Sequence, residues 1–123
     1  MDDIRLKTAD VTIGGYTYKI SCNMNVLADV QEIYNGDMRK ALNDSSAKGI
    51  RNFLTAMIND ARDSLGKEPL TNKQIGREIS FNSAKEIVLP LILSAFTSGN
   101  NTTDKNEKET GDKKNLKTTQ SAE

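Results

Sequence analysis

Residues 9–20, ADVTIGGYTYKI, decide the fold class of this chain. Gly14-Gly15 is a two-residue turn that tolerates positive φ at both positions, so the flanking segments are expected to pair as an antiparallel hairpin. The turn fixes the register, and directly opposed residues of a hairpin point to the same face. The apolar face then consists of Val11, Ile13, Tyr16 and Tyr18. The polar face consists of Asp10, Thr12, Thr17 and Lys19.

Apolar residues downstream of the hairpin recur at the three- and four-residue spacing typical of helices. The first helical segment has Met24, Leu27, Val30, Ile33 and Tyr34 at this spacing, and Asn35-Gly36 ends it. The longest segment runs from Ser46 to about Leu65, and Gly66 is placed to end it. Its apolar stripe consists of Ile50, Phe53, Leu54, Met57, Ile58, Ala61 and Leu65. The patterns and flanking residues predict short helices at about 24–34, 37–42, 46–65, 71–79 and 83–97. The fold class is therefore mainly α with a small N-terminal β-hairpin (α+β).

Capping signals mark the starts of the last two helices. Thr71 with Gln74 and Ser83 with Glu86 both have the spacing of a capping box, in which two side chains bond reciprocally to backbone N–H groups. They predict that one helix begins after Thr71 and the other after Ser83.

The chain divides near residue 98. Residues 99–123 contain only Leu116 and Ala122 as apolar side chains, with five lysines and five acids. Such a segment buries too little surface to offset its ordering entropy, so we expect a disordered polar tail. Residues 1–98 are expected to form a single folded domain.

The composition points away from several function classes. The 17 Lys and Arg balance the 17 Asp and Glu, which argues against nucleic-acid binding by bulk electrostatics. The chain has no His, the commonest general base and zinc ligand. The Met-Asp-Asp start lacks a secretory pattern, and the apolar run Ile87–Leu93 is too short to span a membrane.

Few side chains are candidates for chemistry. Cys22 has no His to activate it and is expected to be a small packed residue. The carboxylate pairs Asp29/Glu32 and Asp60/Asp63 lie at helical spacing, without a third ligand, and fit solvated helix faces. No catalytic, cofactor-binding or metal-ligating residue is predicted, and the protein is expected to be non-enzymatic.

The last helix is unusual because apolar groups surround its axis. In residues 87–96, IVLPLILSAF, only Ser94 is polar. A helix of this kind in a small protein is either a core helix or a surface for a partner. We expect self-association or capture of another apolar helix, with five candidate contact residues: Ile87, Leu89, Leu91, Ile92 and Phe96.

Residues 71–89 allow an alternative from another class. Two short capped helices joined by a few residues are typical of a helix-turn-helix. The second helix would offer Asn82, Ser83, Lys85 and Glu86 to a DNA groove, with one cation against one anion. A small DNA-binding regulator of a phage or mobile element is therefore the alternative function, although phosphate contacts would be weak.

The order of these elements resembles the tail assembly chaperones of long-tailed phages and prophages of Gram-positive hosts. The resemblance covers residues 9–98. Its features are the hairpin with YTYKI, the segments LADVQEIYN and EPLTNKQIGREI, the apolar helix ending in SAF, and the charged tail. The family has no catalytic signature, so no active-site residue is implied.

The resemblance implies a partner and a location. A protein of this family binds the long, apolar tape measure protein in the host bacterial cytoplasm, keeps it soluble for tail-tube assembly, and is absent from the mature virion. A longer product of ribosomal frameshifting often recruits the tail-tube protein. A structural tail or neck component that stays in the particle is the other alternative.

Overall fold

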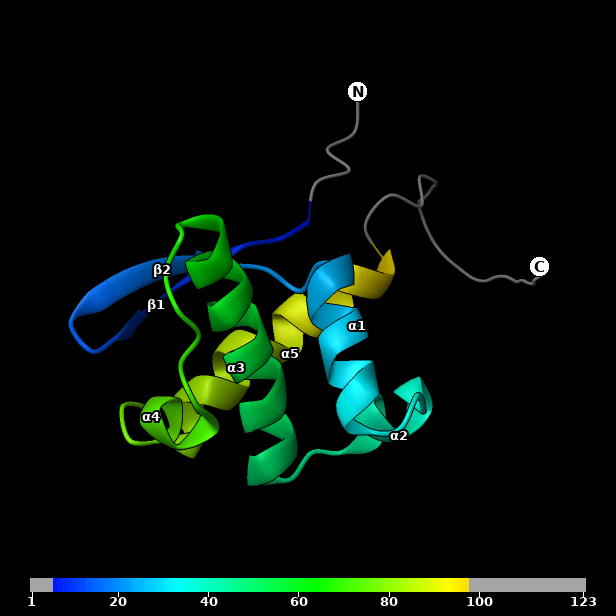
Figure 1. Ribbon diagram of the computed structural model, residues 1–123. Helices are drawn as coiled ribbons and strands as arrows, with labels where there is room; N and C mark the ends of the chain where they lie inside the picture. Colours follow the sequence, from blue (N-terminus) through cyan, green and yellow to red (C-terminus); the bar gives the residue numbers. More distant parts are fainter. Residues whose placement is uncertain (1–5, 98–123) are drawn as a thin grey trace. The chain divides into compact units, whose positions relative to one another are not determined.

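A hairpin followed by five helices makes up residues 6–97, the part of the chain that the computed structural model describes (Figure 1). The elements are β1 (Ala9–Ile13), β2 (Tyr16–Ile20), α1 (Met24–Ile33), α2 (Met38–Asn43), α3 (Ala47–Ser64), α4 (Asn72–Gly76) and α5 (Phe81–Thr97). This confirms the α+β class. Residues 6–95 form one compact unit. The tail predicted over residues 99–123 lies outside the described residues.

The hairpin has the predicted register. Val11 pairs with Tyr18 and Thr12 with Thr17 across an antiparallel ladder, and the two threonine hydroxyls are hydrogen-bonded at 2.8 Å. Gly14 and Gly15 have φ of 61° and 81°, a region in which a side chain would be strained. Local turn chemistry therefore accounts for the register.

Tyr16 departs from the prediction for the apolar face. Val11, Ile13 and Tyr18 are buried, but Tyr16 is 42% exposed next to the turn. Its ring lies 4.6 Å from the Tyr18 ring, and the Lys67 ammonium lies 4.7 Å from its centroid. The tyrosine thus covers the edge of the core instead of entering it.

Helix α3 supplies the centre of the core. Ser46 caps its start by accepting a hydrogen bond from the Gly49 N–H at 3.1 Å. At its end the Gly66 and Lys67 N–H groups donate to the carbonyls of Asp63 and Arg62, with Gly66 at a φ of 75°. The apolar stripe is buried as predicted from Ile50 to Ile58, whereas Leu65 is exposed beyond the last turn.

Helix α1 packs on α3 through a face slightly different from the predicted one. Asn23 is its N-cap and Asn35, with φ of 57°, follows its end. The buried residues are Val26 and Val30, one turn apart, whereas Met24 and Ile33 point outward. The three- and four-residue spacing predicted the helix correctly. It does not determine which of two adjacent apolar stripes on the helix faces α3.

For the last two helices, the predicted end of the first and the predicted start of the second were wrong, whereas the other two boundaries agree with the structure. Helix α4 ends at Gly76 instead of residue 79. Just after this end, the Glu78 N–H donates to the Ile75 carbonyl at 3.0 Å and closes a turn. Helix α5 begins at Phe81, with Ser80 accepting from the Ser83 N–H at 3.2 Å. Ser83 therefore lies inside the first turn and is not the cap. The Thr71–Gln74 capping box is present as predicted.

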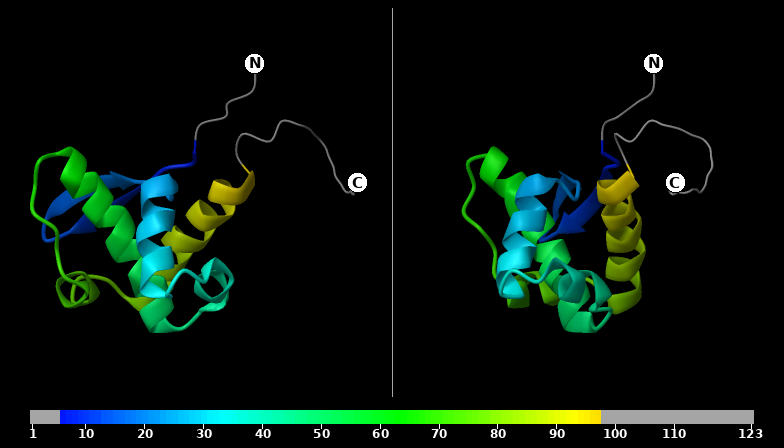
Figure 2. Two further views of the ribbon diagram at one scale, coloured as in Figure 1. Left: turned by 45° about the vertical axis from the view of Figure 1, so that its right-hand side comes forward. Right: turned by 90° about the vertical axis from the view of Figure 1, so that its right-hand side faces the viewer.

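The elements surround α3. Figure 1 shows α3 between the hairpin and α1, with α5 behind it, and the right-hand view of Figure 2 shows α5 along one side. The core joins side chains from the hairpin and from helices α1 to α5. No helix among residues 6–97 has the length and apolar character needed to cross a membrane.

Candidate partner-binding surface

Helix α5 turns one side to the core. Ala84, Val88 and Leu91 are buried at three- and four-residue spacing and belong to the core cluster. Ser94 extends this side and accepts a hydrogen bond from the Lys7 N–H at 2.9 Å, so the only polar residue of the apolar run is used internally. The side that faces the core is thus the apolar face of an amphipathic helix.

The opposite side of α5 changes character along its length. Its first turns expose Asn82, Ser83 and Glu86. Its second half exposes Leu89, Pro90 and Leu93, which we call the α5 patch. Leu89 is 48% and Leu93 65% exposed, and both leucines lie one turn apart on the same side of the helix.

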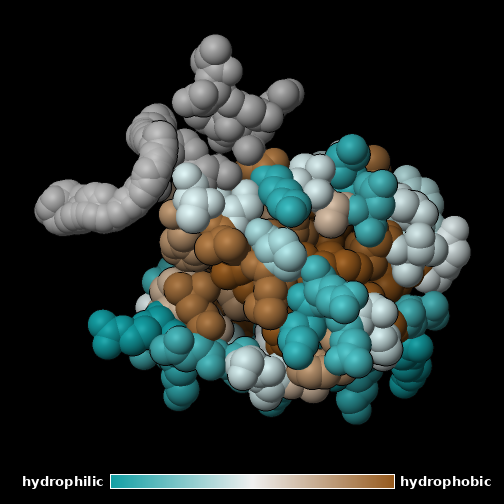
Figure 3. Space-filling view, turned by 180° about the vertical axis from the view of Figure 1, so that it is seen from behind, coloured by the Kyte–Doolittle hydropathy of each residue, from teal (hydrophilic) through white to brown (hydrophobic). Residues whose placement is uncertain are grey.

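Figure 3 shows the molecule from behind, the side on which α5 lies. Apolar side chains gather there between hydrophilic ones. Further along the helix, the side chain of Phe96 is 48% exposed. An exposed group of large apolar side chains on a small protein marks a contact site more often than a single exposed leucine does.

The five predicted contact residues therefore divide into three groups. Leu91 is 1% exposed and belongs to the core, so its assignment to a contact surface was wrong. Ile87 and Ile92 are half-buried and pack against the core. Leu89 and Phe96 are exposed.

Leu93 was missed by the sequence analysis, although it is more exposed than either Leu89 or Phe96. Because every position from 87 to 93 is apolar, the pattern alone does not distinguish the outer side from the inner one. The four-residue spacing from Leu89 to Leu93 was the available signal.

Cys22 is packed, as predicted. Its side chain is buried among the core residues, and desolvation raises the pKa of the thiol to about 11. A thiol of this kind is protonated at neutral pH and inaccessible, so its role is packing.

The carboxylate pairs lie on polar helix surfaces. Asp29, Asp60 and Asp63 line one shallow hollow, but residues 6–97 contain no group of three side chains placed to hold a metal ion. Asp60 accepts a hydrogen bond from the Asn23 amide at 2.7 Å. This bond connects the start of α1 to α3, which is a structural role.

A polar network joins α1, α3 and the segment between α2 and α3. The Tyr34 hydroxyl donates to the Asp44 carboxylate at 2.5 Å and accepts from the buried Asn52 amide at 3.2 Å. Hydrogen bonds from Ser46 and Tyr34 lower the pKa of Asp44. Burial and the Asp44 carboxylate raise the pKa of Tyr34. The network holds the end of α1 against α3.

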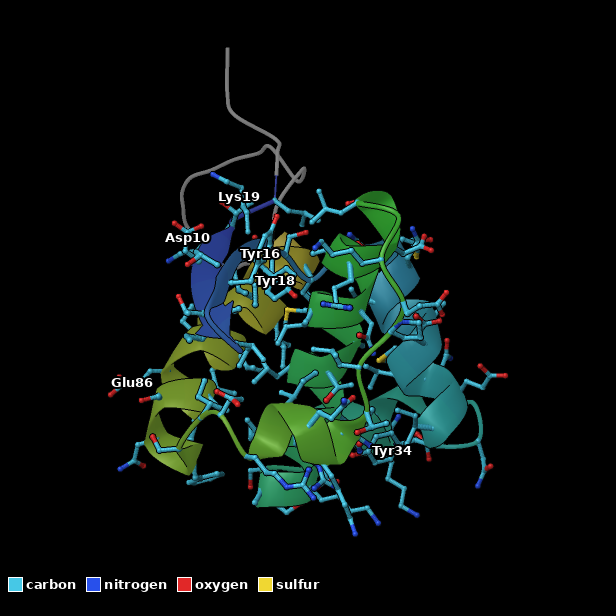
Figure 4. All side chains as sticks on the ribbon, turned by 60° about the vertical axis from the view of Figure 1, so that its left-hand side comes forward. Asp10, Tyr16, Tyr18, Lys19, Tyr34 and Glu86 are labelled. Atoms are coloured by element: carbon cyan, nitrogen blue, oxygen red, sulfur yellow. The ribbon has the colours of Figure 1, made fainter. Side chains whose placement is uncertain are left out.

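The polar face of the hairpin carries charges, and its apolar face carries one aromatic pair. Figure 4 shows Asp10 and Lys19 pointing away from the core, and Tyr16 beside Tyr18. The Tyr18 hydroxyl accepts a hydrogen bond from the Arg62 guanidinium at 2.6 Å. Arg62 also donates to the Glu68 carbonyl, so this cation fixes the loop after α3 to the hairpin.

The segment considered as a helix-turn-helix has a short first helix, because α4 spans only Asn72–Gly76. On α5, the Lys85 ammonium lies 5.3 Å from the Phe81 ring centroid, and Glu86 points outward (Figure 4). The exposed start of α5 therefore presents polar side chains with little net charge.

Comparison with known proteins finds no matching family model, no matching curated protein and no matching solved structure.

Proposed function

We propose that this protein is a non-enzymatic tail assembly chaperone that binds the tape measure protein through apolar helix contacts. The proposal combines the sequence resemblance over residues 9–98 with the α5 patch. The observation that carries it is the exposure of Leu89 and Leu93 on the side of α5 opposite its buried residues Ala84, Val88 and Leu91.

The patch suits an apolar helical client. Complete burial of an exposed leucine gains about 1.5–3 kcal/mol, so covering two half-exposed leucines and a proline favours association. The apolar stripe of the client helix would pack along the second half of α5. Its contact residues would recur at three- and four-residue spacing. The polar first turns of α5 would then mark one end of the contact.

The proposed function includes a cellular location and a second partner, the tail-tube protein. The chaperone acts in the host bacterial cytoplasm and is not part of the mature virion. A longer, frameshifted form would recruit the tail-tube protein, and the polar segment 99–123 would serve as the tether that raises its local concentration.

Co-expression with the tape measure protein from the same genome tests the proposal. We expect the tape measure protein to stay soluble only with this chain and to co-purify with it. Equal aggregation with and without the chain would contradict the proposal. Salt-sensitive retention on DNA would instead favour the regulator, and detection in purified particles would favour a structural component.

A further inference from the structure

We propose that a groove between α3 and the start of α5 is a second binding site, which takes a polypeptide segment with a large apolar side chain next to a carboxylate. The groove has a volume of about 440 Å³, within the range of about 300–1,000 Å³ typical of ligand sites. The first half of α3 forms one wall, and the segment from Gly76 to Ala84 forms the other.

The floor of the groove is apolar. Ile50, Leu54 and Ala84 are buried at its base, and Ile79 is half-buried beside them. Phe81 stands at the rim with 43% of its surface exposed. A bulky apolar side chain entering here would contact groups that are already fixed by the core.

The two charged side chains that line the groove are both cations. Lys48 and Arg51 lie three residues apart on one side of α3, and no carboxylate lines the groove. Neither cation forms an ion pair within residues 6–97. The nearby acid is Asp44, which accepts hydrogen bonds from Tyr34 and Ser46, and the charge of Lys48 is a smaller cause of its lowered pKa.

Arg51 lies against Gly76 in the wall of the groove. Its Cδ packs over Gly76, where an added Cβ would lie 3.5 Å away. Its Nε is buried and has no hydrogen-bond partner in the described part of the chain. The terminal nitrogens of this guanidinium would pair with a carboxylate of the occupant, whose two oxygens match planar N–H groups.

The first turn of α5 adds to the positive character of the site. Ser80, which caps this helix, lines the groove, and the turn contains no acidic residue. Exposed N–H groups at a helix start carry partial positive charge. Two cations and a helix start therefore surround one apolar floor.

This combination selects the occupant. A wholly apolar helix would desolvate Lys48 and Arg51 without pairing them, which is unfavourable. A small inorganic anion would leave the apolar floor uncovered. A peptide with a phenylalanine flanked by glutamates satisfies both parts. The site does not overlap the α5 patch, so it would provide a contact in addition to the one in the proposed function.

Three blocked peptides provide the test: Gly-Glu-Phe-Glu-Gly, its Gln counterpart Gly-Gln-Phe-Gln-Gly, and Gly-Glu-Gly-Glu-Gly without the aromatic. Each is titrated into the full chain at low salt while backbone amide signals are followed by NMR. We expect the first peptide to shift the signals of Gly76, Ser80 and Phe81. It should bind at least about tenfold more tightly than either control, since it alone uses both the floor and the cations.

Variants of matched charge complete the experiment. Arg51→Met keeps the stem and removes the guanidinium, and should weaken binding of the first peptide by about tenfold. Lys19→Met, on the hairpin, should leave binding unchanged, and thermal unfolding verifies that each variant is folded. Equal binding of the Glu and Gln peptides, or unchanged binding by folded Arg51→Met, would overturn the proposal.

The same variants separate this site from the α5 patch. Leu93→Asp should retain the peptide, and Arg51→Met should still co-purify with the tape measure protein. Loss of peptide binding in a folded Leu93→Asp variant, with shifts confined to α5 after residue 88, would show that the peptide occupies the patch and would contradict the groove assignment.

Discussion

At the scale of single residues, Asp44 accepts hydrogen bonds from two parts of the chain. Its carboxylate accepts from the Tyr34 hydroxyl and from the Ser46 backbone and side chain. Tyr34 in turn accepts from Asn52, a polar side chain buried in α3. This network could not be predicted from the sequence, because Tyr34, Asp44 and Asn52 are separated along the chain and none belongs to a recognisable motif.

The lowered pKa of Asp44 predicts a pH dependence of stability. The unfolded chain binds a proton at Asp44 near the ordinary value of 3.8, whereas the folded chain binds it only at lower pH. The carboxylate therefore stabilises the fold fully above that value, and this contribution is lost as the pH falls through the lowered pKa. Urea unfolding at pH 7 and at about pH 3 should show a smaller pH-dependent loss for Asp44→Asn than for the wild type. Identical losses in both proteins would contradict the assignment.

Two helical glycines provide a matched pair of substitutions. A Cβ at Gly49 would lie 2.5 Å from the Asp44 Cγ and closer still to its backbone oxygen, whereas at Gly76 the nearest atom is the Arg51 Cδ at 3.5 Å. Gly49→Ala should lower the free energy of unfolding by about 1–3 kcal/mol through overpacking. Gly76→Ala should be neutral or stabilising by up to about 1 kcal/mol, because alanine favours helix. Chemical denaturation measures both, and equal effects would refute the close approach at Gly49.

At the scale of elements, the sequence was most informative where local chemistry decides the structure. Gly14-Gly15 determined the hairpin register, and Ser46 with Gly66 bounded α3. The sequence was less informative where two local signals compete. Ser80 and Ser83 both precede a helical pattern, and the structure uses Ser80 because the chain must leave α4 and carry Ile79 back to the core.

The observed start of α5 makes a testable distinction between the two serines. Ser80→Ala removes the N-cap and should lower the free energy of unfolding by about 1 kcal/mol. Ser83→Ala removes an exposed hydroxyl inside the first turn and should change it by less than about 0.5 kcal/mol. A larger loss of stability for Ser83→Ala than for Ser80→Ala would contradict a helix start at Phe81 and favour the start predicted after Ser83.

The candidate site shows the same limit of sequence analysis. Leu91 and Leu93 are both leucines in an apolar run, yet one is 1% and the other 65% exposed. Which of them faces outward depends on how α5 lies against α3, and the sequence of α5 does not contain that information. Periodicity therefore predicted the helix and its apolar character but not the members of the α5 patch.

At the scale of the whole molecule, two surfaces are proposed to bind partners. The α5 patch is apolar and uncharged, whereas the groove beside α3 combines an apolar floor with two cations. The total charge of the chain is zero, so we expect any partner recognition to depend on local surfaces instead of a long-range field.

Self-association through the α5 patch would compete with client binding. Sedimentation of the free chain at rising concentration tests for it. If the patch is the contact in both cases, we expect Leu93→Asp to shift any oligomer toward the monomer and to weaken client binding in parallel. If Leu93→Asp changes only the oligomeric state or only client binding, the α5 patch is the contact for that one interaction.

Co-purification of the tape measure protein with three α5 variants tests the central claim most directly. Leu93→Asp places a charge in the α5 patch, Asn82→Asp places one on the polar first turn, and Leu91→Asp places one in the core. The proposed function predicts that Leu93→Asp keeps the wild-type circular dichroism spectrum and loses the client. Asn82→Asp should retain the client, and Leu91→Asp should unfold. A folded Leu93→Asp variant that still keeps the tape measure protein soluble would contradict the assignment of the α5 patch as the client-binding surface.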